Sequence, residues 1–495
     1  MSNSKNNIKN GSCPVYKKCG GCQLQNLSYQ KQLEFKQNKV EKLLKHFAKV
    51  KPIIGMENPY HYRNKVQAAF YTDRRGKIIS GVYQSGTHHV VGIDSCQTED
   101  ITADKIIVAV RKLLPSFKLT TYNEDTHKGF LRHVLVKRGF ATNQVMLVLV
   151  TGTPVFPSKN NFVKAITKQF PEITTVVQNV NPYNTNLVLG DNEKVLYGKG
   201  YIEDILCGCR FRISPKSFYQ INPVQTEVLY GKAIEFADLK GNETVLDTYC
   251  GIGTIGIIAA KNGAGKVIGV ELNGNAVRDA ILNAKANNLK NIRFYKGDAG
   301  EFMFEVSQES EKPDVVFMDP PRAGSSEKFL KSLIKMSPKK VVYVSCNPET
   351  LSRDLEFFLA NSKYKAEKIQ PVDMFPHTAH IETVVLLSHK KADSYIHIDV
   401  EFGEGEGKIP VDSIAKRAEA YKPKEKVTYK MIKEYIEAKY GFKVHTAYIA
   451  EVKRNLGLPM YDAPNAVEEL KQPRKHPTPE KVEAIKDALR YFAVI

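Results

Sequence analysis

The chain has 495 residues, too many for one hydrophobic core, so we expect roughly two to four domains. Its composition, 42% hydrophobic and 25% charged, is that of a globular protein and excludes a disordered chain. We find neither a run of about 18 uncharged apolar residues nor an apolar signal-peptide core. We therefore expect a cytoplasmic protein that makes no contact with a membrane.

The formal net charge of +19 favours a polyanionic partner such as a nucleic acid. The tail from Lys391 onward carries 19 Lys and Arg against 17 Asp and Glu. The first 390 residues hold the remaining 53 basic and 36 acidic groups. The excess positive charge therefore belongs to the body of the chain rather than to its tail.

Four of the eight cysteines stand near the N-terminus, at Cys13, Cys19, Cys22 and Cys96. In a reducing cytosol such cysteines are candidates for metal or cluster ligands rather than for disulfides. Four thiolates could bind zinc or a [4Fe–4S] cluster, and four separate structural cysteines are the alternative. The spacing, with one remote member, does not choose between zinc and iron–sulfur.

Short segments of alternating polarity fill the stretch from about 60 to 215. Examples are the apolar runs at 66–71, 131–138 and 145–150, and turn signals such as 73–76 separate them. Period-two segments of this length are typical of strands. We therefore predict a mostly antiparallel α+β domain here.

From about residue 240 the pattern changes to strands that alternate with helices. We expect strands at 245–247, 266–271, 292–295, 314–318 and 341–345, and helices at 255–261, 275–288, 327–336 and 349–360. This alternation predicts a doubly wound parallel sheet. Two last strands, at 365–372 and 381–387, would close the sheet as an antiparallel pair.

A glycine-rich linker at 402–408 leads to a separate tail. The tail contains two expected helices, at 430–439 and 446–455, around Gly441. Such a pair is compatible with a helix-turn-helix and equally with an ordinary helical pair.

The predicted sheet begins with a glycine-rich turn, Asp247-Thr-Tyr-Cys-Gly-Ile-Gly253. Glycines there permit a tight strand-to-helix turn and a close approach of a ligand to the backbone. Glu271 ends the next strand, where it could accept hydrogen bonds from ribose hydroxyls, and Asp298 ends the third, near an adenine. This turn, the acidic second strand and the terminal hairpin favour S-adenosylmethionine over a dinucleotide.

Two further strand ends carry groups suited to chemistry on a pyrimidine. Asp319-Pro-Pro-Arg322 follows the fourth strand, where amino methyltransferases have an aromatic residue in place of the arginine. Cys346 follows the fifth strand. Uracil C5 is a poor nucleophile, but addition of a thiolate to C6 produces an enolate whose C5 can attack a methyl sulfonium. These residues therefore indicate covalent methyl transfer to uracil.

Such a reaction also needs a base that removes the C5 proton, so that the thiol can leave. Glu382 opens the last apolar strand and suits this role. A charged residue at the end of an edge strand is the alternative interpretation.

These motifs, in this order, resemble the bacterial RNA (uracil-5-)-methyltransferase family, and its ribosomal RNA members in particular. The resemblance covers about residues 12–390. The matching segments are Cys13-Pro-Val-Tyr-Lys-Lys-Cys-Gly-Gly-Cys22, Leu131-Arg-His-Val134, Phe218-Tyr-Gln-Ile-Asn222, the glycine turn, Asp319-Pro-Pro-Arg-Ala-Gly324, Val344-Ser-Cys-Asn-Pro348 and His380-Ile-Glu-Thr-Val384.

The resemblance implies a role for each matched residue. Cys346 would be the nucleophile and Glu382 the base. The expected ligands of S-adenosylmethionine are Gln220, Tyr249, Glu271 and Asp319, and those of a [4Fe–4S] cluster are Cys13, Cys19, Cys22 and Cys96. The target uridine would have to leave its RNA stack.

We expect three parts, of which the first two follow from the resemblance and the third is the tail that lies beyond it. These are an iron–sulfur and central α+β RNA-binding domain at 12–215, a Rossmann-like class I methyltransferase domain at 216–390, and a mostly helical extension at 391–495. We expect a monomer that forms 5-methyluridine in 23S ribosomal RNA. The alternatives are the same chemistry on a uridine in the T-loop of transfer RNA, and a non-catalytic iron–sulfur RNA-binding protein.

Overall fold

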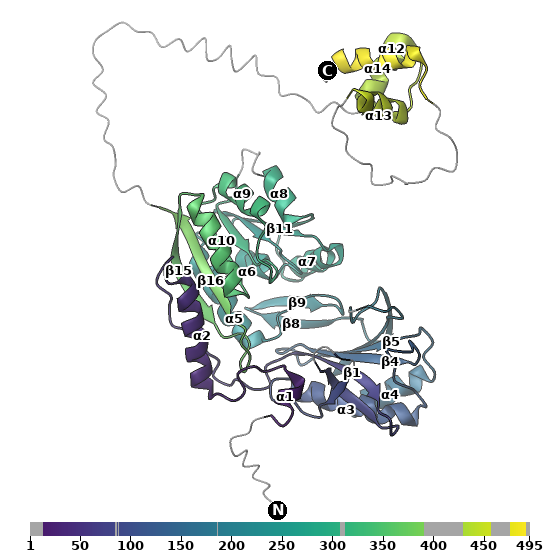
Figure 1. The fold of residues 1–495 in the computed structure, drawn as a ribbon, viewed down its shortest axis with the longest axis vertical. Helices are drawn as coiled ribbons and strands as arrows, with labels where there is room; N and C mark the ends of the chain where they lie inside the picture. The colour runs from purple at the N-terminus through teal and green to yellow at the C-terminus, as the bar shows by residue number, and fades with distance from the viewer. Residues whose placement is uncertain are drawn as a thin grey trace, which may run out of the picture. The chain divides into compact units, whose positions relative to one another are not determined.

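The computed structural model describes residues 13–84, 87, 89–185, 187–306, 312–390, 429–456 and 476–491. The chain divides into two compact units, Met1–Ser394 and Tyr395–Ile495 (Figure 1). None of the helices in these ranges is long and apolar enough to cross a membrane. The linker predicted at 402–408 lies outside the described residues.

A seven-stranded sheet in the order β12-β11-β10-β13-β14-β16-β15 forms the centre of the second half of the larger unit. Its strands are β10 (Thr244–Thr248), β11 (Lys266–Glu271), β12 (Ile292–Lys296), β13 (Val315–Met318), β14 (Lys340–Ser345), β15 (Tyr364–Val372) and β16 (Glu382–His389). The first five strands are parallel, and β16 runs antiparallel to both β14 and β15. The prediction of a doubly wound sheet with a terminal antiparallel pair is confirmed.

Helices cover both faces of this sheet (Figure 1). One face packs against α5 (Pro223–Ala237), α6 (Thr254–Lys261) and α7 (Gly274–Ala286). The other packs against α2 (Tyr29–Leu44), α8 (Ala299–Val306), α9 (Glu327–Met336) and α10 (Pro348–Ala360). Alternate residues of each strand point to opposite faces, so Val342 and Val344 enter one core and Val341 and Tyr343 the other.

Helix α2 lies in the range predicted for the N-terminal domain, yet it packs on this mostly parallel sheet of the second half. Its Val40 and Leu44 are fully buried in the same core as α9 and α10. The segment that follows extends this contact, because Val50 and Ile54 form parallel bridges to β15.

A second seven-stranded sheet, which we call the central sheet, has the order β3-β2-β1-β4-β5-β6-β7. Its strands are β1 (Lys65–Thr72), β2 (Ile78–Tyr83), β3 (Val90–Gly92), β4 (Leu131–Arg138), β5 (Val145–Thr151), β6 (Ile173–Val180) and β7 (Asn192–Tyr197). All pairs are antiparallel except β5 with β6. Helices α3 (Ile101–Ser116) and α4 (Lys159–Gln169) cover one face, in agreement with the mostly antiparallel α+β prediction.

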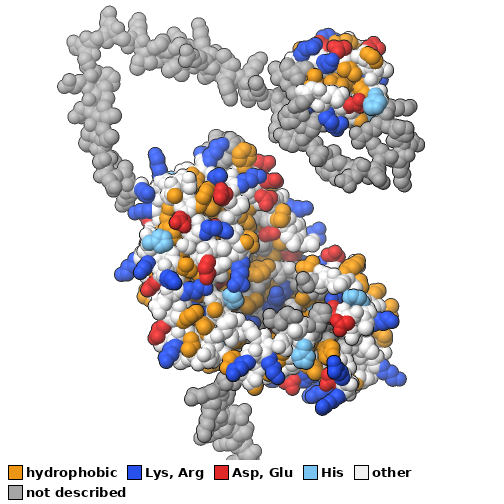
Figure 2. Space-filling view, viewed as in Figure 1, with side chains coloured by type: hydrophobic (Ala, Val, Ile, Leu, Met, Phe, Trp, Pro, Cys, Tyr) orange, Lys and Arg blue, Asp and Glu red, His pale blue; other side chains and the backbone are white. Residues whose placement is uncertain are grey.

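The other face of the central sheet shares a core with the first sheet. Met146 and Val148 of β5 belong to the same buried cluster as Ile252 and Val344. The hairpin of β8 (Ile202–Leu206) and β9 (Cys209–Ile213) contributes to this cluster. Figure 2 shows a recess between the two parts, with Lys and Arg side chains on the described surface around it.

The smaller unit contains the two predicted tail helices, α12 (Tyr429–Tyr440) and α13 (Thr446–Asn455), and a further one, α14 (Pro479–Tyr491). The three share one apolar core that includes Ile436 and Ile485. Gly441 ends α12 with a φ of 74°, the left-handed conformation that favours glycine.

Candidate active site

The glycine-rich turn lies where the strand order reverses, between β10 and β13. Three of its residues have a positive φ, at 61° for Tyr249, 56° for Gly251 and 83° for Gly253. A Cβ atom on Gly253 would lie 2.7 Å from the Phe294 ring, so only glycine fits there. Ligands of doubly wound sheets bind at such a reversal, outside the carboxyl ends of the strands.

Two carboxylates brace this turn. Oδ2 of the buried Asp247 accepts a hydrogen bond from the Gly256 amide at 2.7 Å, and burial raises the Asp247 pKa to about 8. Glu271 Oε2 accepts from the Gly251 amide at 3.0 Å, and its Oε1 accepts from Asn273 at 2.8 Å. Each oxygen keeps a second lone pair, so Glu271 could still accept bonds from ribose hydroxyls.

Asp298 and Tyr249 each contact the beginning of a helix, Asp298 that of α8 and Tyr249 that of α9. Asp298 Oδ1 caps α8, accepting from the amides of Gly300 and Glu301 at 2.9 and 3.1 Å. The half-buried Tyr249 ring lies 5.4 Å from the Phe329 ring on α9. Both residues line the strand ends where the sequence predicts the cofactor.

The register of the antiparallel pair brings Cys346 and Glu382 together. The β14–β16 pairing ends with Ser345 opposite Thr383. Cys346 follows Ser345 at the end of β14, and Glu382 precedes Thr383 on β16. The two residues therefore lie on facing segments. Asp319, directly after β13, is close enough that its charge acts on both side chains.

Burial sets the protonation of this group in the free protein. It raises the pKa of the half-buried Cys346 thiol to about 11, an effect that the charges of Glu382 and Asp319 strengthen and that of Arg322 opposes. Burial and the Asp319 charge raise the Glu382 pKa well above its usual range, and burial raises that of Asp319 to about 7. A cation bound beside Glu382 and Asp319 would favour the ionised forms of both carboxyl groups.

Gln220 is connected to Asp319 and Glu382 through Tyr230, a residue that was not predicted from the sequence. Tyr230 on α5 is buried, and its hydroxyl lies close enough to the side chains of Gln220 and Thr254 that both act to lower its pKa. Burial and the charges of Asp319 and Glu382 raise its pKa. Helix α5 was not predicted, although Asn222 followed by Pro223 is a typical helix start and Asn222 does cap it.

Arg322 of the Asp-Pro-Pro-Arg loop lies at the exposed edge of the site. Its carbonyl accepts bonds from Asn347 and Thr350, both at 3.3 Å, which ties the loop to the start of α10. Its Nη2 lies 3.4 Å from His380 Nδ1, two residues before Glu382. The arginine thus links two of the predicted motifs.

The four N-terminal cysteines are free and partly buried. Burial raises the Cys22 pKa to about 11, and the charges of Cys96, Cys19 and Cys13 all act on it, so the four thiols are neighbours. The Nε atom of Arg63, whose charge also acts on Cys22, is buried with no hydrogen-bond partner in the described part of the chain. This donor set fits a thiolate-bound, negatively charged group.

The same four thiols do not form a ready-made metal site. Among the residues that the structure describes, no three His, Cys, Asp or Glu side chains are arranged to hold a metal ion. The structure therefore gathers the four cysteines into one neighbourhood without a preformed coordination shell.

Comparisons with known proteins identify the family. The model of the family described as tRNA (Uracil-5-)-methyltransferase matches residues 28–390. An uncharacterized RNA methyltransferase of Bacillus cereus is 45% identical over 77% of this chain and 83% of its own length. One of Listeria monocytogenes is 46% identical over 76% of this chain and 83% of its own length.

A solved structure extends the comparison to the fold. The tRNA (uracil-54, C5)-methyltransferase of Pyrococcus abyssi, in complex with S-adenosyl-L-homocysteine, has a TM-score of 0.64 and 31% identity. The match covers 74% of this chain and 85% of that one. The chain therefore belongs to the tRNA (uracil-5-)-methyltransferase family and is an S-adenosylmethionine-dependent RNA methyltransferase.

Proposed function

We propose that the protein methylates C5 of a uridine in 23S ribosomal RNA, with Cys346 as the nucleophile and Glu382 as the base. The observation that supports this most is the β14–β16 register, which ends with the thiol and the carboxyl group on facing segments. The resemblance of the ordered motifs to enzymes that methylate ribosomal RNA supports 23S ribosomal RNA as the substrate.

The proposed reaction begins when the Cys346 thiolate adds to uracil C6 and the C5–C6 π electrons move into an enolate. C5 then attacks the sulfonium methyl group, the S–CH3 bond breaks, and S-adenosylhomocysteine forms. Glu382 takes the proton from C5, and the electrons left behind restore the double bond and expel the Cys346 thiolate. The Cys346 thiol and the Glu382 carboxyl group first lose their protons to water, which the positive charge of a bound sulfonium favours, and Glu382 later passes the C5 proton to water.

We further propose that Gln220, Tyr249, Glu271 and Asp319 bind S-adenosylmethionine. Glu271→Ala should weaken cofactor binding about 10- to 100-fold, since a hydrogen bond to a charged acceptor contributes about 1.5–3 kcal/mol. Titration calorimetry measures this, with Glu356→Ala on an exposed position of α10 as the control. Equal affinities for the two variants would remove Glu271 from the cofactor site.

Cofactor affinity should also rise with pH. Burial raises the Asp319 pKa to about 7, and a bound sulfonium cation favours the ionised carboxylate. Below this pKa the cofactor must first displace a proton, so we expect about tenfold tighter binding at about pH 8 than at about pH 6. S-adenosylhomocysteine lacks the sulfonium charge and is the control. The same pH slope for both ligands would contradict a role of Asp319 beside the methyl donor.

The four neighbouring cysteines, with the cation of Arg63 beside them, support a [4Fe–4S] cluster as a second cofactor. Protein purified without oxygen should show the broad visible absorbance of such a cluster, and Cys19→Ser should lose it. Cys207→Ser, which changes a cysteine of the β8–β9 turn, should keep it. Bound zinc in place of iron would refute the cluster.

A second RNA is a candidate substrate for the same reaction. The names of the family and of the Pyrococcus abyssi enzyme favour a transfer RNA target as the second candidate. Mass-spectrometric mapping of 5-methyluridine in cells with and without the gene separates the two. Loss at a ribosomal position supports the proposal, and loss only in transfer RNA replaces it by the second candidate.

The remaining expectations accompany this proposal. They are a cytoplasmic monomer in which residues 12–215 contact RNA, residues 216–390 bind the cofactor, and residues 391–495 form an extension. The shared core of Met146 and Val344 supports a close association of the first two parts.

A further inference from the structure

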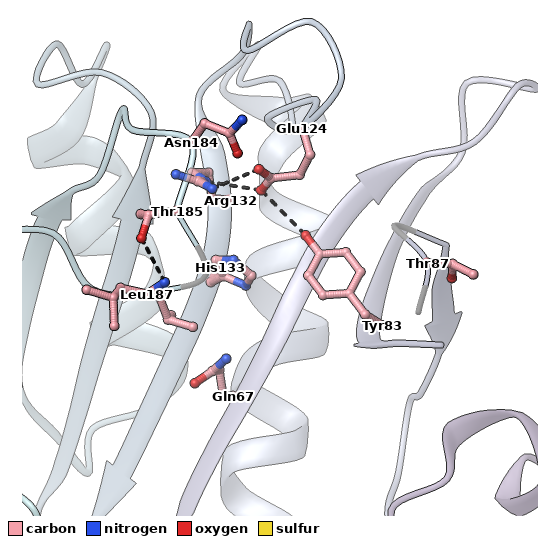
Figure 3. Close-up of a pocket in the computed structure, with 10 residues that line it drawn as sticks. Gln67, Tyr83, Thr87, Glu124, Arg132, His133, Asn184, Thr185 and Leu187 are labelled. Carbon is pink, nitrogen blue, oxygen red and sulfur yellow. Dashed lines mark hydrogen bonds and ion pairs between the residues drawn. The ribbon is translucent and has the colours of Figure 1, made fainter. Parts of the chain in front are cut away.

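A cavity of about 610 Å³ opens on the central sheet, outside the strand ends that carry Cys346 and Glu382. Its volume lies in the range of small-molecule sites. Figure 3 shows His133 in the middle of the side chains that line it. Others are Gln67 of β1, Tyr83 of β2, Arg132 of β4 and Leu187.

The charges of this cavity are balanced within the protein. Arg132 donates two hydrogen bonds to the Glu124 carboxylate, at 3.1 Å from Nε and 2.7 Å from Nη2. Its Nη1 donates to the carbonyls of Asn181 and Tyr183 at 2.7 and 2.9 Å. A guanidinium engaged in this way is poorly placed to bind a phosphate, so the cavity suits an uncharged polar ligand.

His133 lines the cavity and carries a polar atom that no described residue pairs. The residue is 6% exposed, and its Nδ1 is buried with no hydrogen-bond partner among the described residues. Leaving a buried polar atom unpaired is unfavourable, so a hydrogen-bond partner from a ligand would be favourable. Burial and the Arg132 charge lower the His133 pKa to about 4. The neutral ring has one donor and one acceptor nitrogen.

The other walls provide the remaining contacts that a flat heteroaromatic ring needs. The Tyr83 ring lies 5.9 Å from that of His133 at 84°, which leaves an aromatic surface in the cavity. The exposed amide of Gln67 adds both a donor and an acceptor, and Leu187 adds an apolar surface. Unstacked RNA bases are held by such aromatic and hydrogen-bonding side chains.

One strand connects this cavity with the candidate active site. His133, Leu135 and Lys137 alternate along β4 and therefore lie on the same face of the central sheet. Lys137 Nζ donates to the carbonyls of Ser214 and Ser217 at 2.9 and 2.8 Å, in the segment that leads to Gln220. Four residues of strand span about 13 Å, a distance that a few nucleotides would bridge.

We propose that this cavity receives an unstacked base of the substrate RNA that flanks the methylated uridine, with His133 and Gln67 reading its polar edge. The inference rests on the proposed function for the nature of the ligand. It assigns to the Leu131-Arg-His-Val motif the selection of the substrate rather than the methyl transfer.

Abasic scanning of an RNA hairpin that contains the mapped uridine tests this proposal. Each flanking nucleotide is replaced in turn by an abasic one, and the dissociation constant of the full-length protein is measured. We expect a loss of about tenfold at one position, since the stacking of a base contributes about 1–3 kcal/mol. His133→Ala should cause a similar loss with the intact hairpin and no further loss with that abasic hairpin.

Two more variants separate recognition from damage to the fold. Gln67→Ala is an exposed change that should show the same position-specific coupling, and His46→Ala, an exposed histidine after α2, should show none. With saturating RNA the kcat of His133→Ala should stay within about twofold, while the KM for RNA rises. The proposal would be wrong if the affinity losses of His133→Ala and of the abasic nucleotide were additive at every position. It would also be wrong if no abasic position weakened binding by the wild type. A wild type that binds the hairpin without methylating it would instead refute the proposed function.

Discussion

Cys346→Ala should abolish methyl transfer and leave binding of RNA and of S-adenosylmethionine within about twofold of the wild type. Without the thiolate, C5 of uracil is not activated, and loss of a nucleophile of this kind lowers turnover by roughly 10⁴-fold or more. The side chain is half-buried and small, so its removal should not unfold the protein. Incorporation of labelled methyl groups into RNA measures the effect.

Cys207→Ala is the matched control for this result. Cys207 is also partly buried, but it lies in the β8–β9 turn, and no strand end of the candidate site contains it. The control should keep wild-type turnover. Methylation by Cys346→Ala at a rate within tenfold of the wild type would exclude the covalent mechanism.

Glu382→Gln should stop the reaction one step later and trap the RNA on the protein. The methylated adduct forms, but it cannot lose its C5 proton, so the Cys346–C6 bond persists. We expect turnover to fall about 10²- to 10⁴-fold, with close to one methyl group retained per protein. A band of protein with RNA that survives denaturing electrophoresis, and disappears when Cys346 is also replaced, detects the adduct.

The exposed Glu356 provides the control for the loss of a carboxylate, since Glu356→Gln on α10 should turn over normally and form no stable adduct. If Glu382→Gln formed no adduct but lost cofactor affinity, the residue would be a ligand rather than a base. Its burial beside Asp319 makes this comparison informative, because a cationic sulfonium would interact with both carboxyl groups.

Local patterns in the sequence were enough to predict the methyltransferase sheet and the positions of its strand ends. The glycines at 251 and 253 require a turn, and parallel strands such as β13 and β14 are apolar runs between helices. Because strand ends of a parallel sheet meet at one edge, the order of the motifs already places Asp319 near Cys346. The terminal antiparallel strand then brings Glu382 to them.

Contacts between distant parts of the chain were not predictable in the same way. Lys36 of α2 forms a fully buried ion pair with Asp373, and this contact holds an N-terminal helix on the methyltransferase sheet. Neither residue belongs to a recognisable local pattern. Tyr230 was missed for the same reason, and so was the His133 nitrogen that has no partner among the described residues, since their importance depends on which distant side chains surround them.

The release of tritium from RNA labelled at C5 of uridine tests the central claim most directly. The purified protein is incubated with S-adenosylmethionine and with [5-³H]uridine-labelled RNA from cells that lack the gene, and methyl incorporation is measured in parallel. The account predicts one tritium released into water for each methyl group transferred, and neither with Cys346→Ala. Methyl transfer without release of tritium would show that the methyl group goes elsewhere than C5, and would contradict the account.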